Sequence, residues 1–148
     1  MSSVFNGATA FNGNISTWDV SGVTNMNHMF RGAKNFNRDI SSWNVSSLKF
    51  MGNMFNGAIA FNQNLSSWNV SGVTYMGDSF LGVTDFSAAN YDKLLDGWSK
   101  LLSLQSNVSF GAPPTYYCNV TARDILVNTF SWTISGDTEG TTEQCTTP

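Results

Sequence analysis

The sequence predicts an α/β fold: a solenoid of about three to four 25-residue rungs, each with a short parallel strand and a short helical segment, and a mixed α/β C-terminal cap. One observation is a start of the form Phe-x-Gly that recurs every 25 residues, at Phe5, Phe30, Phe55 and Phe80. Another is that the copy at 5–29 matches the copy at 55–79 at 16 of 25 positions. A unit of this length cannot bury its apolar face alone, so neighbouring units must stack to complete a core.

Each unit contains two apolar patterns. The first has the Leu-x-x-Leu-x-Leu spacing of the strand in a leucine-rich repeat, at Ile15, Trp18, Val20 and Val23. The second has helical spacing, at Met26, Met29 and Phe30. Since side chains alternate along a strand, we expect the tryptophan row to point into the core, with each indole N–H donating to a turn carbonyl or a hydroxyl. This row consists of Trp18, Trp43 and Trp68. The alternative is a platform on which sugars stack.

Asparagine and aspartate recur in two rows between these patterns. The rows are Asn12, Asn37 and Asn62, and Asn14, Asp39 and Asn64. We interpret them as ladders that hydrogen-bond the turn backbone, because cation sites of this kind need several carboxylates.

We predict one continuous structural domain with three parts. The repeats occupy 1–86, as units at 5–29, 30–54 and 55–79 and a partial unit at 80–86. The cap occupies 87–135, with a helix that begins after Asn90, a short strand at 107–110, a second helix capped by Thr121 and a strand at 132–134. The tail at 136–148 is expected to be loose except where a cysteine pins it.

The chain has two cysteines, Cys118 and Cys145. We predict that they form a disulfide, because a polar tail gives an isolated Cys145 no packing role. The bond would close a loop of 27 residues, and a loop of that size stabilises the fold by ~3 kcal/mol in the chain-entropy model. The alternative is two unrelated free thiols.

Composition excludes some partners. Charged residues make up only 11% of the chain and the net charge is −3. Nucleic acids require a basic face, and membrane surfaces attract basic amphipathic helices, so neither partner is expected. No apolar run is long enough to cross a bilayer, so this segment is not expected to insert into a membrane.

The repeat also resembles a known family. The pattern Phe-Asn-x-x-Ile-Ser-x-Trp-Asp/Asn-Val-Ser-x-Val-Thr-x-Met-x-x-Met-Phe begins at Phe11 and is similar to the repeat of BspA-like bacterial surface proteins and mycoplasma surface lipoproteins. Segments 91–98 and 130–134 resemble the end of those arrays, so the likeness covers about 5–135. The resemblance implies a leucine-rich-repeat-like fold, surface exposure and a role in adhesion. The unit has 25 residues where the family's is often described as having 26.

Catalytic, cofactor and metal sites are not indicated by the residues. His28 is the only histidine and does not recur in later units. No carboxylate pair recurs, since Asp19 gives way to Asn44 and Asn69, and acid–base catalysis needs matched groups. No cluster of cysteine and histidine suits zinc. We therefore expect a non-enzymatic protein without a cofactor.

The outward strand positions are the predicted ligand-binding face. They form three polar rows, namely Thr17, Ser42 and Ser67; Asp19, Asn44 and Asn69; and Ser21, Ser46 and Ser71. Rungs roughly 4.8 Å apart would make a flat ladder that suits a protein or glycan. The alternative is a plain solvated sheet. A second predicted surface, for self-assembly, is the uncovered first rung around Phe5 and Phe11. Asn107 and Asn119 are candidate glycosylation sites.

These observations lead to three functional hypotheses. The leading one is a surface or secreted repeat module for adhesion, which binds a protein or glycan through the strand face. The alternative is a structural protein that forms a homo-oligomer, either a dimer or a head-to-tail filament, through its N-terminal rung. Ice or crystalline-polysaccharide binding ranks third, because regular Thr-x-Thr ladders are absent. No signal peptide is visible, so we expect a C-terminal piece of a longer extracellular or cell-surface protein.

Overall fold

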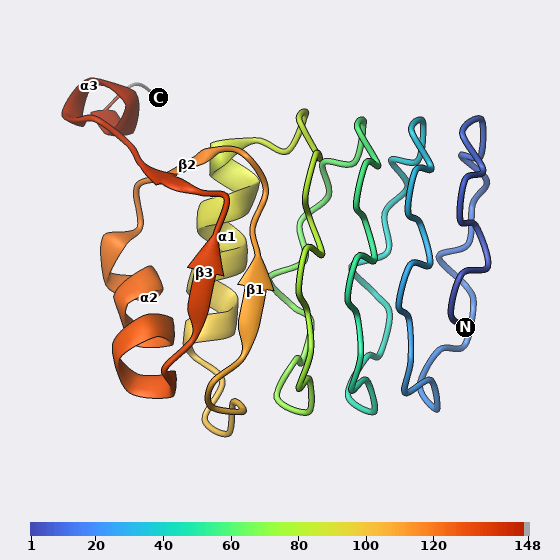
Figure 1. The fold of residues 1–148 in the computed structure, drawn as a ribbon, viewed down its shortest axis with the longest axis horizontal. Helices are drawn as coiled ribbons and strands as arrows, with labels where there is room; N and C mark the ends of the chain where they lie inside the picture. The colour runs from blue at the N-terminus through green and yellow to red at the C-terminus, as the bar shows by residue number, and fades with distance from the viewer. Residues whose placement is uncertain (147–148) are drawn as a thin grey trace.

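The computed structural model describes residues 1–146 and shows a mixed α/β fold with short helices and strands. The 25-residue units lie side by side in one row, and the helices and strands gather at the end opposite the N-terminus (Figure 1). The elements are α1 (Ala88–Ser99), β1 (Ser109–Gly111), β2 (Tyr116–Tyr117), α2 (Val120–Asp124), the π-helix η1 (Ile125–Thr129), β3 (Thr133–Ser135), β4 (Thr138–Glu139) and α3 (Thr142–Thr146). Residues 147–148 of the predicted tail lie outside the described residues.

The prediction of a strand and a helical segment in each unit is wrong. Residues 1–86 contain turns and isolated bridges, with no helix or extended strand. The predicted strand is two tight turns, closed by bonds from Trp18 N–H to Ile15 O and from Val23 N–H to Val20 O. The predicted helical segment is a run of turns in which His28 and Gly32 have φ of 59° and 68°. Positive φ breaks a right-handed helix, so these N–H groups bond to the neighbouring unit instead.

Backbone hydrogen bonds between residues about 25 positions apart link successive turns along the row. Met26 N–H donates to Phe50 O at 2.8 Å, Phe30 N–H to Met54 O at 2.8 Å and Gly32 N–H to Asn56 O at 2.7 Å. Elsewhere the direction is reversed, since Asn35 N–H donates to Thr9 O at 3.1 Å and Lys49 N–H to Thr24 O at 2.9 Å. Each side of the row therefore carries both backbone donors and backbone acceptors.

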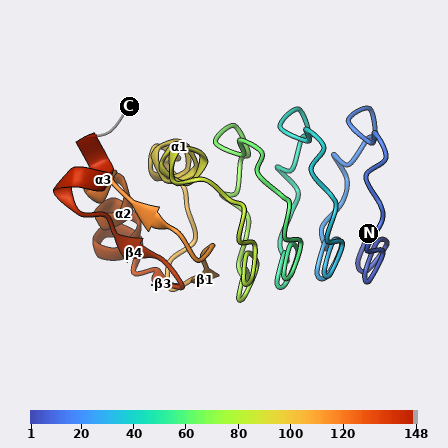
Figure 2. The same ribbon diagram turned by 90° about the horizontal axis from the view of Figure 1, so that it is seen from above.

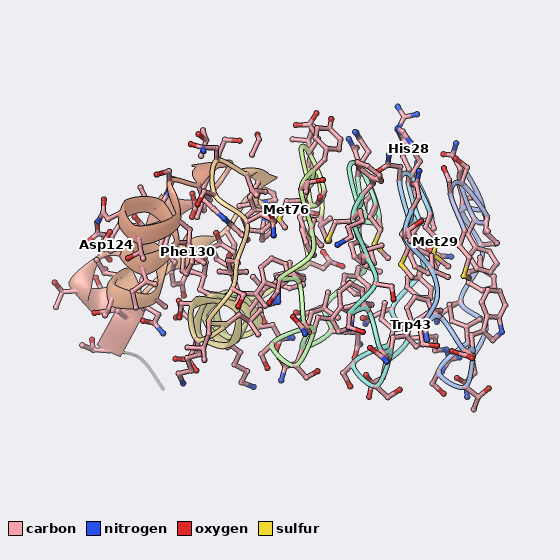
Figure 3. All side chains as sticks on the ribbon, turned by 90° about the horizontal axis from the view of Figure 1, so that it is seen from below. His28, Met29, Trp43, Met76, Asp124 and Phe130 are labelled. Carbon is pink, nitrogen blue, oxygen red and sulfur yellow. A yellow bond between two sulfur atoms is a disulfide. The ribbon has the colours of Figure 1, made fainter. Side chains whose placement is uncertain are left out.

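The core is a set of side-chain columns that run along the row. Phe30 and Phe55 stack with ring centroids 5.5 Å apart, and Phe36 and Phe61 with centroids 5.8 Å apart. All four rings are fully buried. The units are seen from above in Figure 2, and Figure 3 places Met29 inside the stack, where it is fully buried.

The cap continues the row with a different backbone. Helix α1 lies against the last unit, where Trp98 Nε1–H donates to Leu65 O at 3.2 Å. Strand β1 accepts the hydrogen bond that a further unit would accept, since Phe80 N–H donates to Gly111 O at 2.9 Å. β1 pairs with β3 and β2 with β4, both in parallel. The predicted cap helices and strands are present near their expected places, although Ser87 caps α1 instead of Asn90 and Asn119 caps α2 instead of Thr121.

The tail has regular structure within residues 136–146, contrary to the expectation of a loose segment. Strand β4 and helix α3 both form after residue 136. Asp137 lies buried and pairs with Arg123 at 2.7 Å. The predicted disulfide between Cys118 and Cys145 is present, with Cα atoms 5.5 Å apart. The expectation failed because composition does not reveal the buried partner of Asp137.

Candidate binding surface

The tryptophan row forms part of the core in the inner units. Trp43 Nε1–H donates to Ile15 O and Trp68 Nε1–H to Ile40 O, each at 3.1 Å. The prediction of buried rings with satisfied N–H groups is therefore confirmed for these two residues. Trp18 is the exception, at 39% exposure, because no earlier unit in this chain covers it.

The asparagine rows support the turn backbone, as predicted. Asn12 Oδ1 accepts from Asn37 N–H at 3.0 Å, Asn37 Oδ1 from Asn62 N–H at 2.9 Å, and Asn62 Oδ1 from Ser87 N–H at 3.0 Å. In the second row, Asp39 Oδ1 accepts from Ser41 N–H within its own turn. Hydrogen bonds from Ser41 lower the pKa of the Asp39 carboxyl below its usual value of 3.8. Within residues 1–146, no group of three or more histidine, cysteine, aspartate or glutamate side chains could hold a metal ion.

The polar rows predicted to bind ligand lie on exposed turns. The Oδ1 atoms of Asp19, Asn44 and Asn69 each accept from the backbone N–H two residues later, at 3.0, 3.2 and 3.1 Å. The Ser21 hydroxyl also donates to Asp19 at 2.7 Å, and this bond is the main cause of a lowered pKa at Asp19. One oxygen of each side chain in this row is thus engaged in its own turn.

The row of Thr17, Ser42 and Ser67 is exposed to solvent on consecutive units. Ser67 Oγ–H donates to Ser41 O of the preceding unit at 2.9 Å, which holds the two units in register at this surface. The three predicted rows lie on or beside the turns of each unit, not on strands.

The first unit presents an uncovered aromatic face. Phe5 and Phe11 stack on each other with centroids 3.8 Å apart, and both are half-buried. Among the described residues, none donates to the carbonyls of Ser2, Val4 and Asn6, which occupy the positions that accept bonds in the later units. This end of the row therefore offers apolar rings and backbone acceptors.

A shallow groove of about 430 Å³ crosses the units and was missed by sequence reasoning. Its floor contains one glycine from each unit, namely Gly7, Gly32, Gly57 and Gly82. Side chains that line it include Arg31, Lys34 and Ile59. The signal in the sequence was the glycine of the Phe-x-Gly start, which recurs every 25 residues.

Two exposed aromatic side chains were also missed. Phe50 and Tyr75 are 42% and 46% exposed and lie on neighbouring units joined by a parallel bridge. A Cβ atom on Gly52 would overlap the Tyr75 ring, so the ring lies across the backbone there. The first unit has Asn25 at this position, so the feature is not imposed by the repeat.

The cap holds a buried polar network. Asp137 accepts from Tyr91 Oη–H at 2.8 Å and from two nitrogens of Arg123 at 2.7 and 3.0 Å. Burial, and then the charge of Asp137, raise the pKa of Tyr91. The bond to Asp137 raises the pKa of Arg123, whose guanidinium lies 4.7 Å from the centre of the Tyr117 ring. The network fastens α1, α2 and the tail together.

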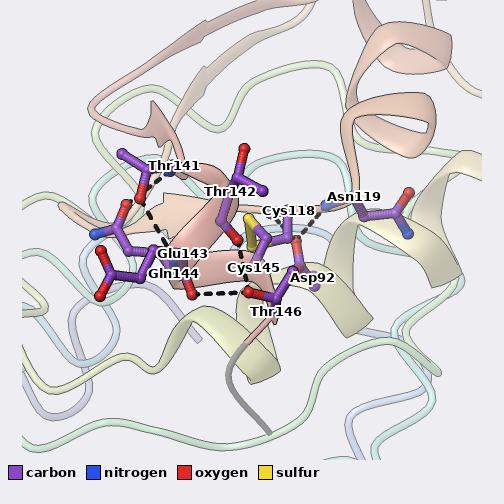
Figure 4. The surroundings of a disulfide bond; sticks show 9 residues. All are labelled: Asp92, Cys118, Asn119, Thr141, Thr142, Glu143, Gln144, Cys145 and Thr146. Carbon is purple, nitrogen blue, oxygen red and sulfur yellow. Dashed lines mark hydrogen bonds between the residues drawn. A yellow bond between two sulfur atoms is a disulfide. The ribbon is translucent and has the colours of Figure 1, made fainter.

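The surroundings of the disulfide include Asp92 and Asn119 (Figure 4). Asp92 Oδ1 accepts from the N–H groups of Cys118 and Asn119, both at 2.9 Å. A hollow of about 380 Å³ between the start of α1 and α3 is lined in part by both cysteines. Of the predicted glycosylation sites, Asn107 is exposed, whereas Asn119 uses its side-chain oxygen to cap α2. Glycosylation itself stays a prediction.

None of the helices within the described residues has the length and apolar character needed to cross a membrane.

Comparisons with known proteins place the chain in a family. No curated protein and no solved structure matches the chain. The family model described as "Mycoplasma protein of unknown function, DUF285" matches residues 1–94. This match covers more than half of the chain, which therefore belongs to the DUF285 family of mycoplasma-type repeat proteins.

Proposed function

We propose that the protein is a non-enzymatic repeat module of the surface-exposed, BspA-like kind, which adheres to a protein or glycan. Its units would form the end of a leucine-rich-repeat-like solenoid of three to four rungs. Its location would be extracellular, or on the surface of a cell. The observation that carries this proposal is the face on which exposed polar side chains recur in register on consecutive units, at Thr17, Ser42 and Ser67.

Physical reasons favour binding over catalysis. The recurring polar groups face solvent or hold turns, and His28 has no equivalent in the neighbouring units. A face that repeats unit by unit offers many modest hydrogen bonds to an extended ligand, and repeat proteins use such surfaces for binding. The disulfide fits an oxidising compartment, since thiols stay reduced in the cytosol.

The proposal is tested by blocking this face. We would change Thr17, Ser42 and Ser67 to arginine, which adds bulk without touching the aspartate and asparagine caps. The control carries three arginines on the cap, at the exposed positions Thr121, Asn128 and Thr129. Both variants and the parent are applied to an array of glycans and matrix proteins. Loss of a bound ligand in the face variant alone supports the proposal, and equal signals in all three contradict it.

Self-assembly through the N-terminal face is the second candidate. The exposed Trp18 and the stacked pair of Phe5 and Phe11 favour it, since apolar rings at an uncovered end gain from burial. Light scattering over a concentration series tests it: a strict monomer would overturn self-assembly, and a dimer weakened by changing Trp18 to Ser would support it.

A further inference from the structure

We propose that the glycine-floored groove binds an extended acidic glycan, carrying carboxylate or sulfate groups, along the row of units. This inference rests on the proposed function, because it assigns a ligand class and a second surface to the same binding module. The groove holds about 430 Å³ and draws lining residues from four successive units. Four glycines about 4.8 Å apart would extend for roughly 15 Å, which suits a chain molecule better than a compact one.

The glycines leave the floor of the groove without side chains. Their φ angles are 68° to 74°, in the left-handed region. Each unit has a second left-handed position, with φ of 53° to 61°, and there the residues are Ser3, His28, Asn53 and Asp78. The left-handed conformation alone therefore does not require glycine in this chain, although it favours it.

Packing does not require glycine in the groove either. A Cβ atom on Gly32 would lie 3.7 Å from Gly7 Cα, an ordinary contact, and one on Gly7 would meet nothing within 4 Å. The positive φ favours glycine at every unit, and the bare floor that results leaves room for a ligand to approach the backbone closely.

The charge on the groove is positive although the chain is acidic overall. Arg31 and Lys34 both line it and are exposed, and no aspartate or glutamate lines it. Neither cation forms an ion pair within residues 1–146. Asn6 and Asn56 add amide groups to the lining. Two unpaired cations with amides nearby complement an anion that also carries hydroxyl groups.

A peptide fits the floor less well than a glycan does. Addition of a peptide strand needs free backbone donors. The N–H groups of Gly7, Gly32 and Gly57 are all occupied, since they donate to carbonyls of the next unit at 2.7 to 2.8 Å. A ligand must therefore bind through charge and through contact with a flat floor.

Direct titration of the intact, disulfide-bonded chain tests the proposal. The probes are a hexamer of galacturonic acid, dextran sulfate, neutral maltohexaose and a poly-glutamate peptide, measured by calorimetry at low and moderate salt. The variant R31Q/K34Q removes both charges, and G32N fills the floor with a residue that tolerates positive φ. Their controls are K49Q/K93Q, two exposed cations that do not line the groove, and H28N, the other left-handed position of the same unit.

We expect an acidic glycan to bind, to bind less at higher salt, and to be weakened about 2- to 25-fold by R31Q/K34Q, the range for two exposed charge pairs. G32N should weaken it as well, and the controls should not. Binding that all variants leave unchanged would overturn the proposal that the groove binds the glycan, but not the proposed adhesion function. A preference for maltohexaose or poly-glutamate would have the same consequence. Failure of all four probes, together with a blank array for the polar-row test, would remove both proposals.

Discussion

At the scale of single residues, one tryptophan in each inner unit both fills the core and saturates a carbonyl of the unit before it. Changing Trp43 to Phe removes the donor to Ile15 O. Ile15 O keeps the bond from the Trp18 backbone N–H, so the change removes one buried hydrogen bond, which costs about 0.5–1.5 kcal/mol, and the smaller ring adds a cavity cost. We expect urea unfolding to show a loss of at least this size.

Trp18 provides the matched control for this change. It holds the same place in its unit but is 39% exposed, and its indole N–H has no hydrogen-bond partner among residues 1–146, unlike those of Trp43 and Trp68. Changing Trp18 to Phe should therefore alter the free energy of unfolding by less than about 0.5 kcal/mol, as surface changes usually do. Equal losses for the two variants would contradict the role given to the hydrogen bond.

The two aspartates of the turns give the fold a pH dependence at low pH. Hydrogen bonds from Ser21 and Ser41 hold the pKa values of Asp19 and Asp39 below 3.8. A lowered pKa contributes stability that is present above the unfolded value and lost as pH falls through the folded value. Changing both residues to Asn keeps the turn oxygen, as Asn44 shows. The melting temperature of this variant should fall less than that of the parent between pH 7 and about pH 2.

The role of a residue can be predicted from the sequence wherever the same residue type recurs at the same position of the 25-residue unit. The period correctly predicted the buried tryptophans and the turn-supporting asparagines, because both recur in register. It could not reveal Phe50 and Tyr75, or the cations Arg31 and Lys34, because these replace different residues in neighbouring units. The groove and the aromatic pair could not be predicted from the sequence, because side chains that differ from unit to unit are not indicated by the repeat pattern.

At the scale of elements, the units resemble strands and helices in their spacing but form neither. The spacing of apolar residues indicates which side chains point inward. A stack of turns can bury those side chains as well as a strand can. The backbone conformation at His28 and Gly32 prevents a helix here, because their positive φ directs their N–H groups to the next unit. In the cap, with no such repeat, helix α1 followed its apolar stripe and was predicted within a few residues.

The tail is held to the cap by a buried ion pair, which gives an element-scale prediction. Asp137 is 1% exposed and Arg123 20% exposed. Changing Asp137 to Ala leaves the guanidinium and the Tyr91 hydroxyl without their partner, and breaking a buried pair in this way costs about 3–5 kcal/mol. Changing Asp96 to Ala breaks the exposed pair with Lys100, where the side chains are 47% and 71% exposed, and should cost about 0–1 kcal/mol. Similar losses in urea unfolding would refute the anchoring role.

Helix α3 depends on the disulfide more than on packing. None of its residues is buried. Reduction, or replacement of both cysteines by serine, should lower the free energy of unfolding by about 3 kcal/mol in the chain-entropy model. Hydrogen exchange should show the α3 amides unprotected in the serine variant while the amides of the repeat units keep their protection. Retained protection in α3 would show that contacts other than the disulfide hold it.

At the scale of the whole molecule, the row has one covered end and one open end, so its stability should be graded. The unit that begins at Phe5 has a neighbour on one side, whereas the unit that begins at Phe55 lies between another unit and the cap. In a stack whose stability is a sum of nearest-neighbour terms, a unit with one interface opens more readily than a unit with two.

Native-state hydrogen exchange can measure this gradient with amides that hold the same place in different units. Phe5 N–H donates to Met29 O at 2.9 Å, and Phe55 N–H donates to Ser79 O at 2.8 Å, so bond geometry is nearly the same. Gly7 and Gly57 form a second matched pair, at 2.7 and 2.8 Å. We expect slower exchange for Phe55 and Gly57, because opening them requires separating two interfaces. Equal rates within each pair would mean that the units and cap unfold as one cooperative block, and the nearest-neighbour description would then be wrong.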